Sequence, residues 1–464
     1  MIKKLTFAFI SILFVLAFSC TSSSNLQSKK NQNNQNKEIQ QNEIQNIEKQ
    51  NGECANVELT KTEIQKDKVQ ENELQLKKNQ KVEVQKTETE TVDSSKNTQK
   101  NQNIPTNDEI ELLFAGDIMA HSNNYHISSF DKIWRDVKHL IDGNDFAFAN
   151  IEAPVDTTKP VSNYPNFNMP QNYVQAAVDA GFNVFSLCNN HSNDQYLEGI
   201  KETLKTVDRI CEQASKKENP SALYFSGLKN SKESEFSYNL IEKNGWKILF
   251  LPVTELLNRP DFSDYINFIK TDDASRKKFL DYVKKLRESN PCTVFILSIH
   301  TSEPEYTRNV TKRQEKFYKD LINNGVDIIW ANHAHIIKNR KIIVDTNGNS
   351  DKLIMYANGN TVSGQRRNPD LTSKNPDGER DNTGDGLFYK VTLKKENNGS
   401  VKIKKCEPIL ITTYINTASE FVLKPLNQDF VNYLYSVPRT NWAKYIERRI
   451  IINQEATKDL IEWQ

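Results

Sequence analysis

The chain has 464 residues, enough for two or more domains, and its 61 basic and 60 acidic side chains leave a net charge of +1. That balance creates no overall field toward nucleic acid or an anionic membrane, so a nucleic-acid-binding function is not expected. The hydrophobic fraction of 37% is low for an entirely globular chain, and the N-terminal quarter accounts for it.

Residues 1–20 have the pattern of a secretory signal peptide that ends in a cysteine. Two lysines precede an apolar core that is too short for a transmembrane helix. Residues 16–20 resemble a bacterial lipobox, in which the cysteine is lipidated, for example with palmitate, and becomes the new N-terminus. We therefore expect an exported protein that a lipid on Cys20 holds on the bacterial membrane, periplasmic or surface-exposed. An ordinary signal peptide with an incidental cysteine is the alternative.

Residues 21–107 consist mainly of Asn, Gln, Lys, Glu, Thr and Ser and include no aromatic residue. Such a segment cannot bury enough apolar surface to offset its chain entropy. We expect a disordered low-complexity tether between the lipid anchor and a globular domain. Weakly amphipathic patches such as EIQQNEIQNIEKQ leave transient or paired helices as an alternative.

From about residue 109 the composition changes to apolar runs that alternate with helical patterns. Six runs have the length and residue types of buried strands: LLFAGD, FAFANIE, VFSLCNNH, VFILSIH, DIIWANHAH and LIMYANGN. Helical periods are expected over residues 130–141, 173–178, 274–289 and 311–324, and Gly325 is a suitable stop for the last. Strands that alternate with helices predict a largely parallel sheet with helices packed on it.

The C-terminal part has a different pattern. Residues 387–416 read as antiparallel strands around an Asn-Gly turn. We therefore place a globular α/β domain at residues 108–416 and a mainly helical tail at residues 417–464.

The apolar runs end in residues that can hold a metal ion. The seven residues at these ends are Asp117, Glu152, Asn190, His191, His300, His333 and His335. In an α/β sheet, ligands bind beyond the carboxyl ends of the strands. Oxygen and imidazole ligands without thiolates suit Mn, Fe, Zn or Mg, and this set is large enough for two divalent ions. His121, four residues past Asp117, is a further candidate ligand.

The order of these motifs resembles that of the CapA family, the poly-γ-glutamate capsule synthesis proteins, which are related to calcineurin-like metallophosphoesterases. The motifs, which span roughly residues 110–365, are Gly116-Asp117, Asn150-Ile151-Glu152, Asn189-Asn190-His191 with Asp194, His300, His333-Ala334-His335 and Asn358-Gly359-Asn360. The resemblance implies a metallophosphatase-like α/β/β/α sandwich.

The resemblance also implies roles for individual residues. Asp117 and His335 would bind a first metal ion, and Glu152 would lie between the two ions. Asn190, His300 and His333 would bind the second ion. His191 would be the general acid, oriented by Asp194.

Arg366 and Arg367 follow the last motif and are candidates for binding an anionic substrate. The surrounding loop is rich in Gly, Pro, Asn and Asp, so a solvated loop is the alternative that the composition favours.

These features favour a lipid-anchored, metal-dependent hydrolase or transferase of the cell envelope. The resemblance implies a poly-γ-glutamate-like polymer or a phosphoester as its substrate. One alternative is a non-catalytic accessory protein that binds or helps export an envelope polymer. A surface adhesin on a long stalk is a weaker one.

Overall fold

The computed structural model describes residues 108–346 and 348–463. The predicted signal peptide, the lipidation at Cys20 and the tether at residues 21–107 lie outside these residues. No helix within the described ranges is long and apolar enough to cross a membrane.

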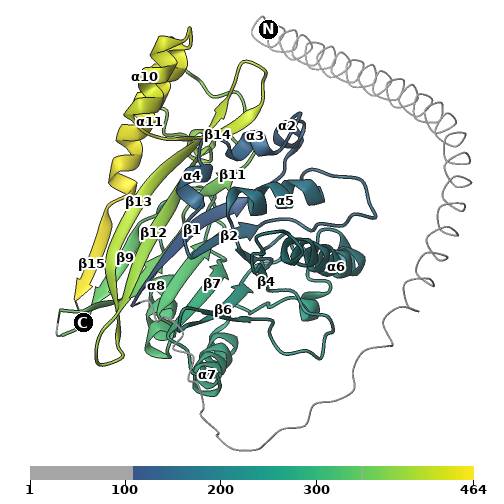
Figure 1. Cartoon of the computed structure of the whole chain (residues 1–464), viewed down its shortest axis with the longest axis vertical. Coiled ribbons are helices and arrows are strands. Elements are labelled where there is room, and N and C mark those ends of the chain that lie inside the picture. Colours follow the sequence, from purple (N-terminus) through teal and green to yellow (C-terminus); the bar gives the residue numbers. More distant parts are fainter. Residues whose placement is uncertain (1–107, 347, 464) are drawn as a thin grey trace, which may run out of the picture. The chain divides into compact units, whose positions relative to one another are not determined.

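The described residues form two β-sheets with helices on their outer faces (Figure 1). The first sheet has the order β14 (Phe421–Pro425), β13 (Val401–Ile415), β12 (Asp385–Lys395), β1 (Glu109–Ile118), β2 (Phe146–Ile151), β3 (Val184–Ser186) and β4 (Tyr224–Ser226), and β11 (Asn360–Val362) also pairs with β1. The second sheet has the order β15 (Asp459–Trp463), β9 (Arg340–Val344), β10 (Ser350–Met355), β8 (Ile328–Asn332), β7 (Val294–His300), β6 (Trp246–Thr254) and β5 (Asn239–Lys243).

Each of the six predicted strands is confirmed. The runs fall on β1, β2, β3, β7, β8 and β10. Strands β1 to β4 pair in parallel, as do β6, β7, β8 and β10. The antiparallel β12–β13 pair is confirmed as well. The carboxyl ends of the parallel strands of each sheet therefore lie at a common edge, where the polar residues follow.

The longer helices are α5 (Gln171–Ala180), α6 (Tyr196–Ser215), α7 (Asp273–Ser289), α8 (Lys312–Asn323), α10 (Gln428–Ser436) and α11 (Thr440–Ala456). The short ones are α2 (Ser122–Tyr125), α3 (Asp131–Trp134), α4 (Lys138–Ile141), α9 (Glu379–Asn382) and the 3₁₀ turn η1 (Ser263–Tyr265). The helical period over residues 130–141 is thus divided between α3 and α4. The amides of Val137 and Leu140 bond to carbonyls three residues earlier, so tight turns replace a continuous helix.

The four layers follow from the alternation of side chains along each strand. On β1, Leu112 and Phe114 face the core between the two sheets, whereas Leu113 and Ala115 face α5 and α6. On β7, Phe295 and Leu297 face α7 and α8 in the same way. Both faces of the central strands are buried, which explains their continuous apolar runs. The predicted α/β/β/α sandwich is confirmed.

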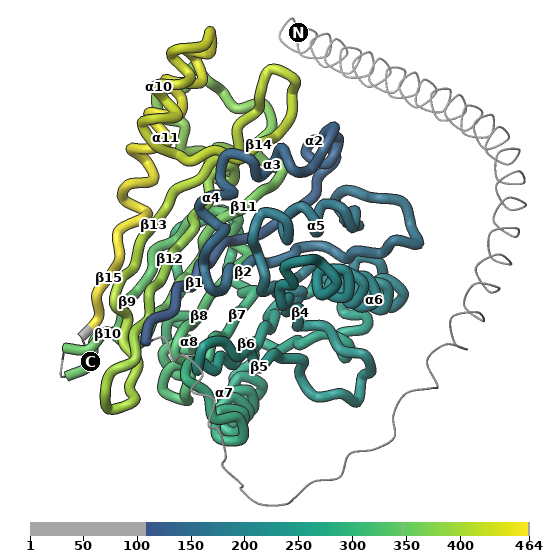
Figure 2. Tube along the Cα trace, viewed as in Figure 1, coloured from purple at the N-terminus to yellow at the C-terminus, as the bar shows by residue number. Residues whose placement is uncertain are grey.

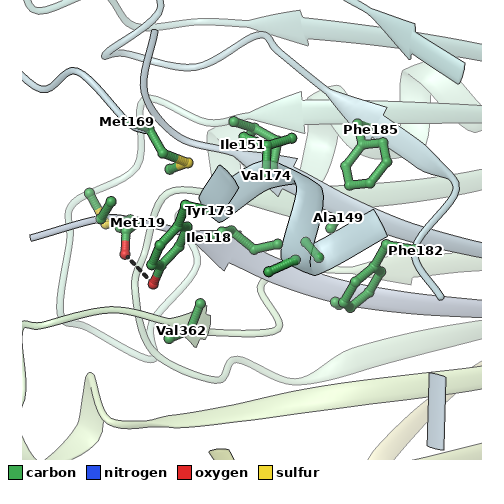
Figure 3. Packing of buried hydrophobic residues seen from close by; sticks show 14 of the residues in the cluster. Ile118, Met119, Ala149, Ile151, Met169, Tyr173, Val174, Phe182, Phe185 and Val362 are labelled. Atoms are coloured by element: carbon green, nitrogen blue, oxygen red, sulfur yellow. Dashed lines mark hydrogen bonds between the residues drawn. The ribbon is translucent and has the colours of Figure 1, made fainter. Parts of the chain in front are cut away.

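Helix α5 shows how this packing reaches the polar edge of the sheet (Figure 3). Its Tyr173 is fully buried among strand side chains such as Ile151. The Tyr173 hydroxyl donates to the backbone carbonyl of Met119 at 3.2 Å. This bond fixes the chain two residues beyond Asp117.

The C-terminal residues add to both sheets. Strand β14 continues the first sheet past residue 416, and α10 and α11 pack against it and β13. Helices α10 and α11 fall within residues 417–464, where the sequence predicted a mainly helical tail, and strands β14 and β15 lie in the same range. Strand β15, which the sequence analysis did not anticipate, pairs in parallel with β9 at the edge of the second sheet (Figure 2).

Candidate metal centre

The ends of strands from both sheets meet at one site. Asp117 is the penultimate residue of β1, and Glu152 directly follows β2. His300 ends β7 in the second sheet, and His333 and His335 follow β8. The structure thus brings together acidic residues of the first sheet and imidazoles of the second.

Two groups of buried side chains have the geometry to hold a metal ion. Potential ligand atoms of Asp117, Glu152 and His335 lie within 4.8 Å of one another, as do those of Glu152, His300 and His333. Glu152 belongs to both groups. We call these the first and second clusters.

The Glu152 carboxylate is fully buried, and neither of its oxygens accepts a hydrogen bond from the described residues. Its Oε1 lies 3.6 Å from Nε2 of His300 and 3.8 Å from Nε2 of His335. An ionised carboxylate buried without donors carries a large desolvation cost. Burial, followed by the charges of Asp117 and Glu305, raises the pKa of Glu152 well above its usual value. A divalent cation would offset both the desolvation of Glu152 and its repulsion by the neighbouring carboxylates. The two clusters therefore fit a divalent metal ion.

The imidazoles are mostly in the state that metals require. Burial and the neighbouring His335 lower the pKa of His333 to about 3, and burial and His333 likewise lower that of His300. Both rings are therefore neutral at pH 7, the form that binds metal. Burial would also lower the pKa of His335, but its hydrogen bond to Asp117 and the Asp117 charge outweigh burial and raise it.

The ring of His335 is oriented by Asn360. Nδ1 of His335 lies 3.0 Å from Oδ1 of Asn360, and the Asn360 amide nitrogen donates to the Thr383 carbonyl at 2.9 Å. These bonds make Nδ1 a donor and leave Nε2 free on the side of Glu152. An imidazole that donates from one nitrogen while the other faces a ligand position is typical of metal sites.

Asn190 adds an oxygen to the second cluster. Its Oδ1 lies 2.8 Å from Nε2 of His300, and its amide nitrogen donates to Oδ1 of Asn258 at 3.2 Å. The second bond fixes which end of the amide faces His300. The structure therefore places the Asn190 oxygen next to the second cluster.

The backbone at the clusters is constrained. His333 has φ +103° and His335 has φ +57°, values that non-glycine residues rarely adopt. Such strain is held only where surrounding contacts fix the chain, most often at functional sites. The backbone of Gly359 also approaches β1 closely at Gly116. A Cβ at position 116 would lie 1.8 Å from the carbonyl oxygen of Gly359, so this approach requires glycine.

His191 and Asp194 form a separate pair beside the clusters. Nδ1 of His191 lies 2.7 Å from Oδ2 of Asp194, and that oxygen also accepts from the Phe167 amide at 2.8 Å. Phe167 packs edge-on against the imidazole, with ring centroids 4.7 Å apart. A ring held by a carboxylate on one side and an aromatic side chain on another has a fixed orientation, which proton transfer requires.

A cavity of about 830 Å³ opens over this centre. Its wall includes Asn190, His191, Asp194 and His335, together with three arginines, Arg259, Arg367 and Arg380. Arg259 stacks on the ring of Tyr196, with 4.6 Å between the guanidinium carbon and the ring centroid, and Arg380 lies over Tyr306 at 5.5 Å. Planar guanidinium groups at a cavity wall suit carboxylate or phosphate groups.

The two adjacent arginines of the predicted substrate site are separated by the fold. Arg367 is exposed and lines the cavity. Arg366 does not, because its buried guanidinium pairs with Asp385 and donates to Thr412 Oγ1 at 2.8 Å. The expectation that Arg366 contacts substrate is therefore corrected: its side chain is occupied within the protein.

His121 also lines the cavity, but it belongs to neither cluster. Its Nδ1 accepts a hydrogen bond from the Gly364 amide at 3.1 Å. Burial, followed by the charges of His335 and His191, lowers its pKa to about 3. In this structure His121 is a neutral residue of the cavity wall that fixes the Gly364 loop.

Sequence reasoning missed three contributors. Asn258 contacts both Asn190 and His191, and Arg259 and Arg380 line the cavity. The sequence did contain a signal for Asn258 and Arg259. Both residues follow the apolar run WKILFLPVT, which forms β6. Arg380 lies in the four-residue helix α9, which is too short to show a periodic pattern, and no local signal marks it.

Comparison with known proteins finds relatives over the region that carries these motifs. The model of the family described as bacterial capsule synthesis protein PGA_cap matches residues 111–365. Capsule biosynthesis protein CapA of Bacillus anthracis is 24% identical over 272 residues, which cover 56% of this chain and 61% of that protein. PGA biosynthesis protein CapA of Bacillus subtilis (strain 168) is 23% identical over 269 residues, 56% of this chain and 65% of that protein. The chain thus spans less than two thirds of the length of these relatives.

Solved structures give weaker likenesses. A calcineurin-like phosphoesterase, YfkN from Bacillus subtilis, aligns with a TM-score of 0.36 and 12% identity over 73% of this chain and 99% of that chain. A putative 5'-nucleotidase from Staphylococcus aureus has the same TM-score and 11% identity over 67% of this chain and 56% of that one. TM-scores this low establish no shared fold, so the architecture rests on the strands and helices described above.

Proposed function

Since this chain belongs to the bacterial capsule synthesis protein family PGA_cap, we propose that it is a metal-dependent hydrolase or transferase of the bacterial cell envelope. The observation that carries the proposal is the buried carboxylate of Glu152, which two ligand clusters share beside the His191–Asp194 pair. A structural carboxylate at that depth would have hydrogen-bond donors, whereas this one faces imidazoles and a second carboxylate.

In this proposal the protein binds two divalent ions. Asp117, Glu152 and His335 would hold the first, and Glu152, His300 and His333 with Asn190 the second. Ions so bound supply Lewis-acid chemistry, which polarises the bond under attack and favours a deprotonated nucleophile at neutral pH.

The protein's own side chains supply the proton and the orientation. Asp194 holds Nδ1 of His191, so Nε2 of that ring is the atom that would give its proton to the leaving group. Arg259, Arg367 and Arg380 would orient anionic groups of the substrate along the cavity. Their positions favour a poly-γ-glutamate-like polymer or a phosphoester over a neutral substrate.

The test is to load the purified protein with manganese or zinc, measure bound metal, and screen a generic phosphodiester and poly-γ-glutamate for cleavage. We expect bound metal, a melting temperature that chelator lowers, and turnover of one substrate class. His300→Ala and His333→Ala should each reduce bound metal, because each loses a ligand of the second cluster. Absence of bound metal, together with melting that chelator leaves unchanged, contradicts the proposal. Metal and polymer binding without turnover would favour an accessory protein that binds or helps export the polymer.

We also propose that the protein is exported and anchored to the bacterial membrane by a lipid on Cys20. The lipobox-like sequence at residues 16–20 supports this location. Cys20→Ala should abolish incorporation of labelled palmitate and shift the protein out of the membrane fraction, because the acyl chain supplies the membrane affinity. Equal labelling of the variant and the unchanged protein would rule out this cysteine as the acylation site.

A further inference from the structure

The segment of residues 364–384 contributes to one wall of the cavity. Gly364, Gln365, Arg367 and Arg380 from this segment line the cavity. Most of the segment lies beyond residue 365, where the family match ends. Apart from α9 it has no regular secondary structure, so other parts of the chain must hold its two arginines in place.

One end of the segment is fixed by Arg366. Its guanidinium forms an ion pair with Asp385 and donates to the Asp381 carbonyl, the Nε contact measuring 2.9 Å. A Cβ on Gly384 would lie 2.0 Å from Nε of Arg366, so only glycine fits beside this side chain. Arg367 therefore follows directly on an anchored residue.

The other end is fixed by the C-terminal helix α11. Arg449 donates from Nε to Asp385 at 2.7 Å, from Nη2 to Oδ1 of Asn382 at 2.7 Å, and from Nη1 to the Pro376 carbonyl. The Tyr445 hydroxyl donates to Asp381 at 2.6 Å. Asp381 and Asn382 directly follow Arg380, so α11 fixes the second arginine from its C-terminal side.

This network is buried and electrostatically matched. Asp385, Arg366 and Arg449 are at most 1% exposed. Burial alone would raise the pKa of Asp385, but the charges of Arg366 and Arg449 outweigh it and hold that pKa below its usual value. Charged groups of this kind resist rearrangement, because the loss of one partner leaves another charge buried and uncompensated.

The segment is linked to the first cluster through Asn360. The carbonyl of Thr383 accepts from Asn360, whose Oδ1 receives the hydrogen bond from His335. The bonds made by α11 to Asn382 and Asp385 thus hold the chain on both sides of Thr383, which is linked to the candidate ligand His335 through Asn360.

We infer that Arg449 is a positioning residue for the cavity: through Asp385, Asn382 and Pro376 it holds the segment that presents Arg367 and Arg380 to an anionic ligand. Helix α11 lies outside the family match, so this chain sets the cationic wall of its site with its own C-terminal part. The nature of the ligand rests on the proposed function, whereas the placement of the segment does not.

The experiment compares Arg449→Met with the unchanged full chain, using a labelled poly-γ-glutamate oligomer as the probe. We expect the Kd to rise about tenfold, the effect of one weakened charge-assisted contact. The dependence of Kd on salt should become shallower, because fewer protein charges meet the polymer. Trypsin should cleave after Arg367, Lys374 and Arg380 several-fold faster, since the segment is no longer held.

Tyr445→Phe is the variant that keeps the fold, because it removes only the hydroxyl that bonds to Asp381. It should change Kd and trypsin cleavage in the same direction, by less. Tyr435→Phe is its matched control: the Tyr435 hydroxyl, on α10, donates to Glu447 of α11 at 3.1 Å, and Glu447 is not part of the segment. This control should match the unchanged protein in all three measurements.

A double variant, Arg367→Gln with Arg380→Gln, tests whether Arg449 acts on ligand binding through these two arginines. In that background Arg449→Met should add little to the Kd, because the charges that it positions are gone. If Arg449→Met raises the Kd in the double variant as much as in the unchanged protein, the inference is overturned. It is also overturned if Arg449→Met lowers the melting temperature but leaves the Kd and its salt dependence unchanged. If the unchanged protein does not bind the probe, the proposed ligand class fails. Trypsin cleavage then decides alone, and an unaltered rate in Arg449→Met and Tyr445→Phe overturns the positioning role.

Discussion

Glu152→Gln is expected to remove metal binding at both clusters, because Glu152 is the residue that they share. Manganese at 100 times its Kd stabilises a folded protein by about 2.7 kcal/mol. For the roughly 350 residues that the structure describes, this corresponds to a rise in melting temperature of about 4 °C. The unchanged protein should show this rise and Glu152→Gln should not, as calorimetry with manganese and with chelator will report.

The same substitution should raise the stability of the metal-free protein. In chelator the Glu152 carboxylate is buried without a hydrogen-bond donor, and a neutral amide avoids that cost. Glu303→Gln is the matched control, since that carboxylate is also buried but accepts from the Thr311 amide and hydroxyl, both at 2.7 Å. The control should be destabilised with and without metal, and its gain from manganese should stay. A Glu152→Gln variant that keeps the gain from manganese contradicts the shared-ligand assignment.

The pH dependence of this difference has a defined sign. The pKa of Glu152 is raised in the folded metal-free protein, so its contribution to stability is full below the unfolded value of about 4.3. That contribution is lost as pH rises through the folded pKa. In chelator, the free energy of unfolding of Glu152→Gln minus that of the unchanged protein should therefore be larger at pH 8 than at pH 5. Urea denaturation at both pH values measures this difference in the free energy of unfolding. Equal differences at pH 5 and pH 8 would show that the pKa of Glu152 is not raised in the folded protein.

His191→Gln should lower any turnover ~10²–10⁴-fold, the usual contribution of a positioned general acid. Metal content should stay nearly unchanged, because His191 belongs to neither cluster. Asp194→Asn should lower turnover less, since it weakens the orientation of the imidazole but leaves the ring in place. His139→Gln makes the same chemical change at an exposed histidine outside the cavity and should have no effect. Retained turnover with lost metal in His191→Gln would make that residue a ligand and not the acid.

The positions of the strand ends could be predicted from the sequence, because each apolar run of strand length stops where a polar residue of ligand type begins. An apolar run of strand length predicts where a buried strand ends, and Asp117, Glu152 and His300 stand at those ends. Parallel pairing within each sheet then places Asp117 beside Glu152 at one edge and His300 at the corresponding edge of the second sheet, whereas the approach of the two sheets depends on their packing. The alternation of strands and helices indicated the layers in the same way.

The part of the cavity wall that residues 364–384 contribute could not be predicted on these grounds. Arg366 and Arg367 are adjacent in an irregular loop, and no local pattern shows that one is buried against Asp385 while the other faces the cavity. The partner that decides this, Arg449, lies about 80 residues further along the chain, on a helix whose apolar face gives no hint of the contact. Long-range polar contacts of this kind depend on the finished packing.

The division of ligands between two sheets has a consequence for when the site can form. Asp117 and His333, whose carboxylate and backbone amide are 3.4 Å apart, are separated by 216 residues. Strand β1, which carries Asp117, lies between β2 and β12, and β12 begins only at Asp385. A chain growing from its N-terminus would make Asp117 and Glu152 long before His333 and His335 existed to complete either cluster. An incomplete polypeptide would thus have little hold on a metal ion, and capture of the ion would come only at the end of its maturation.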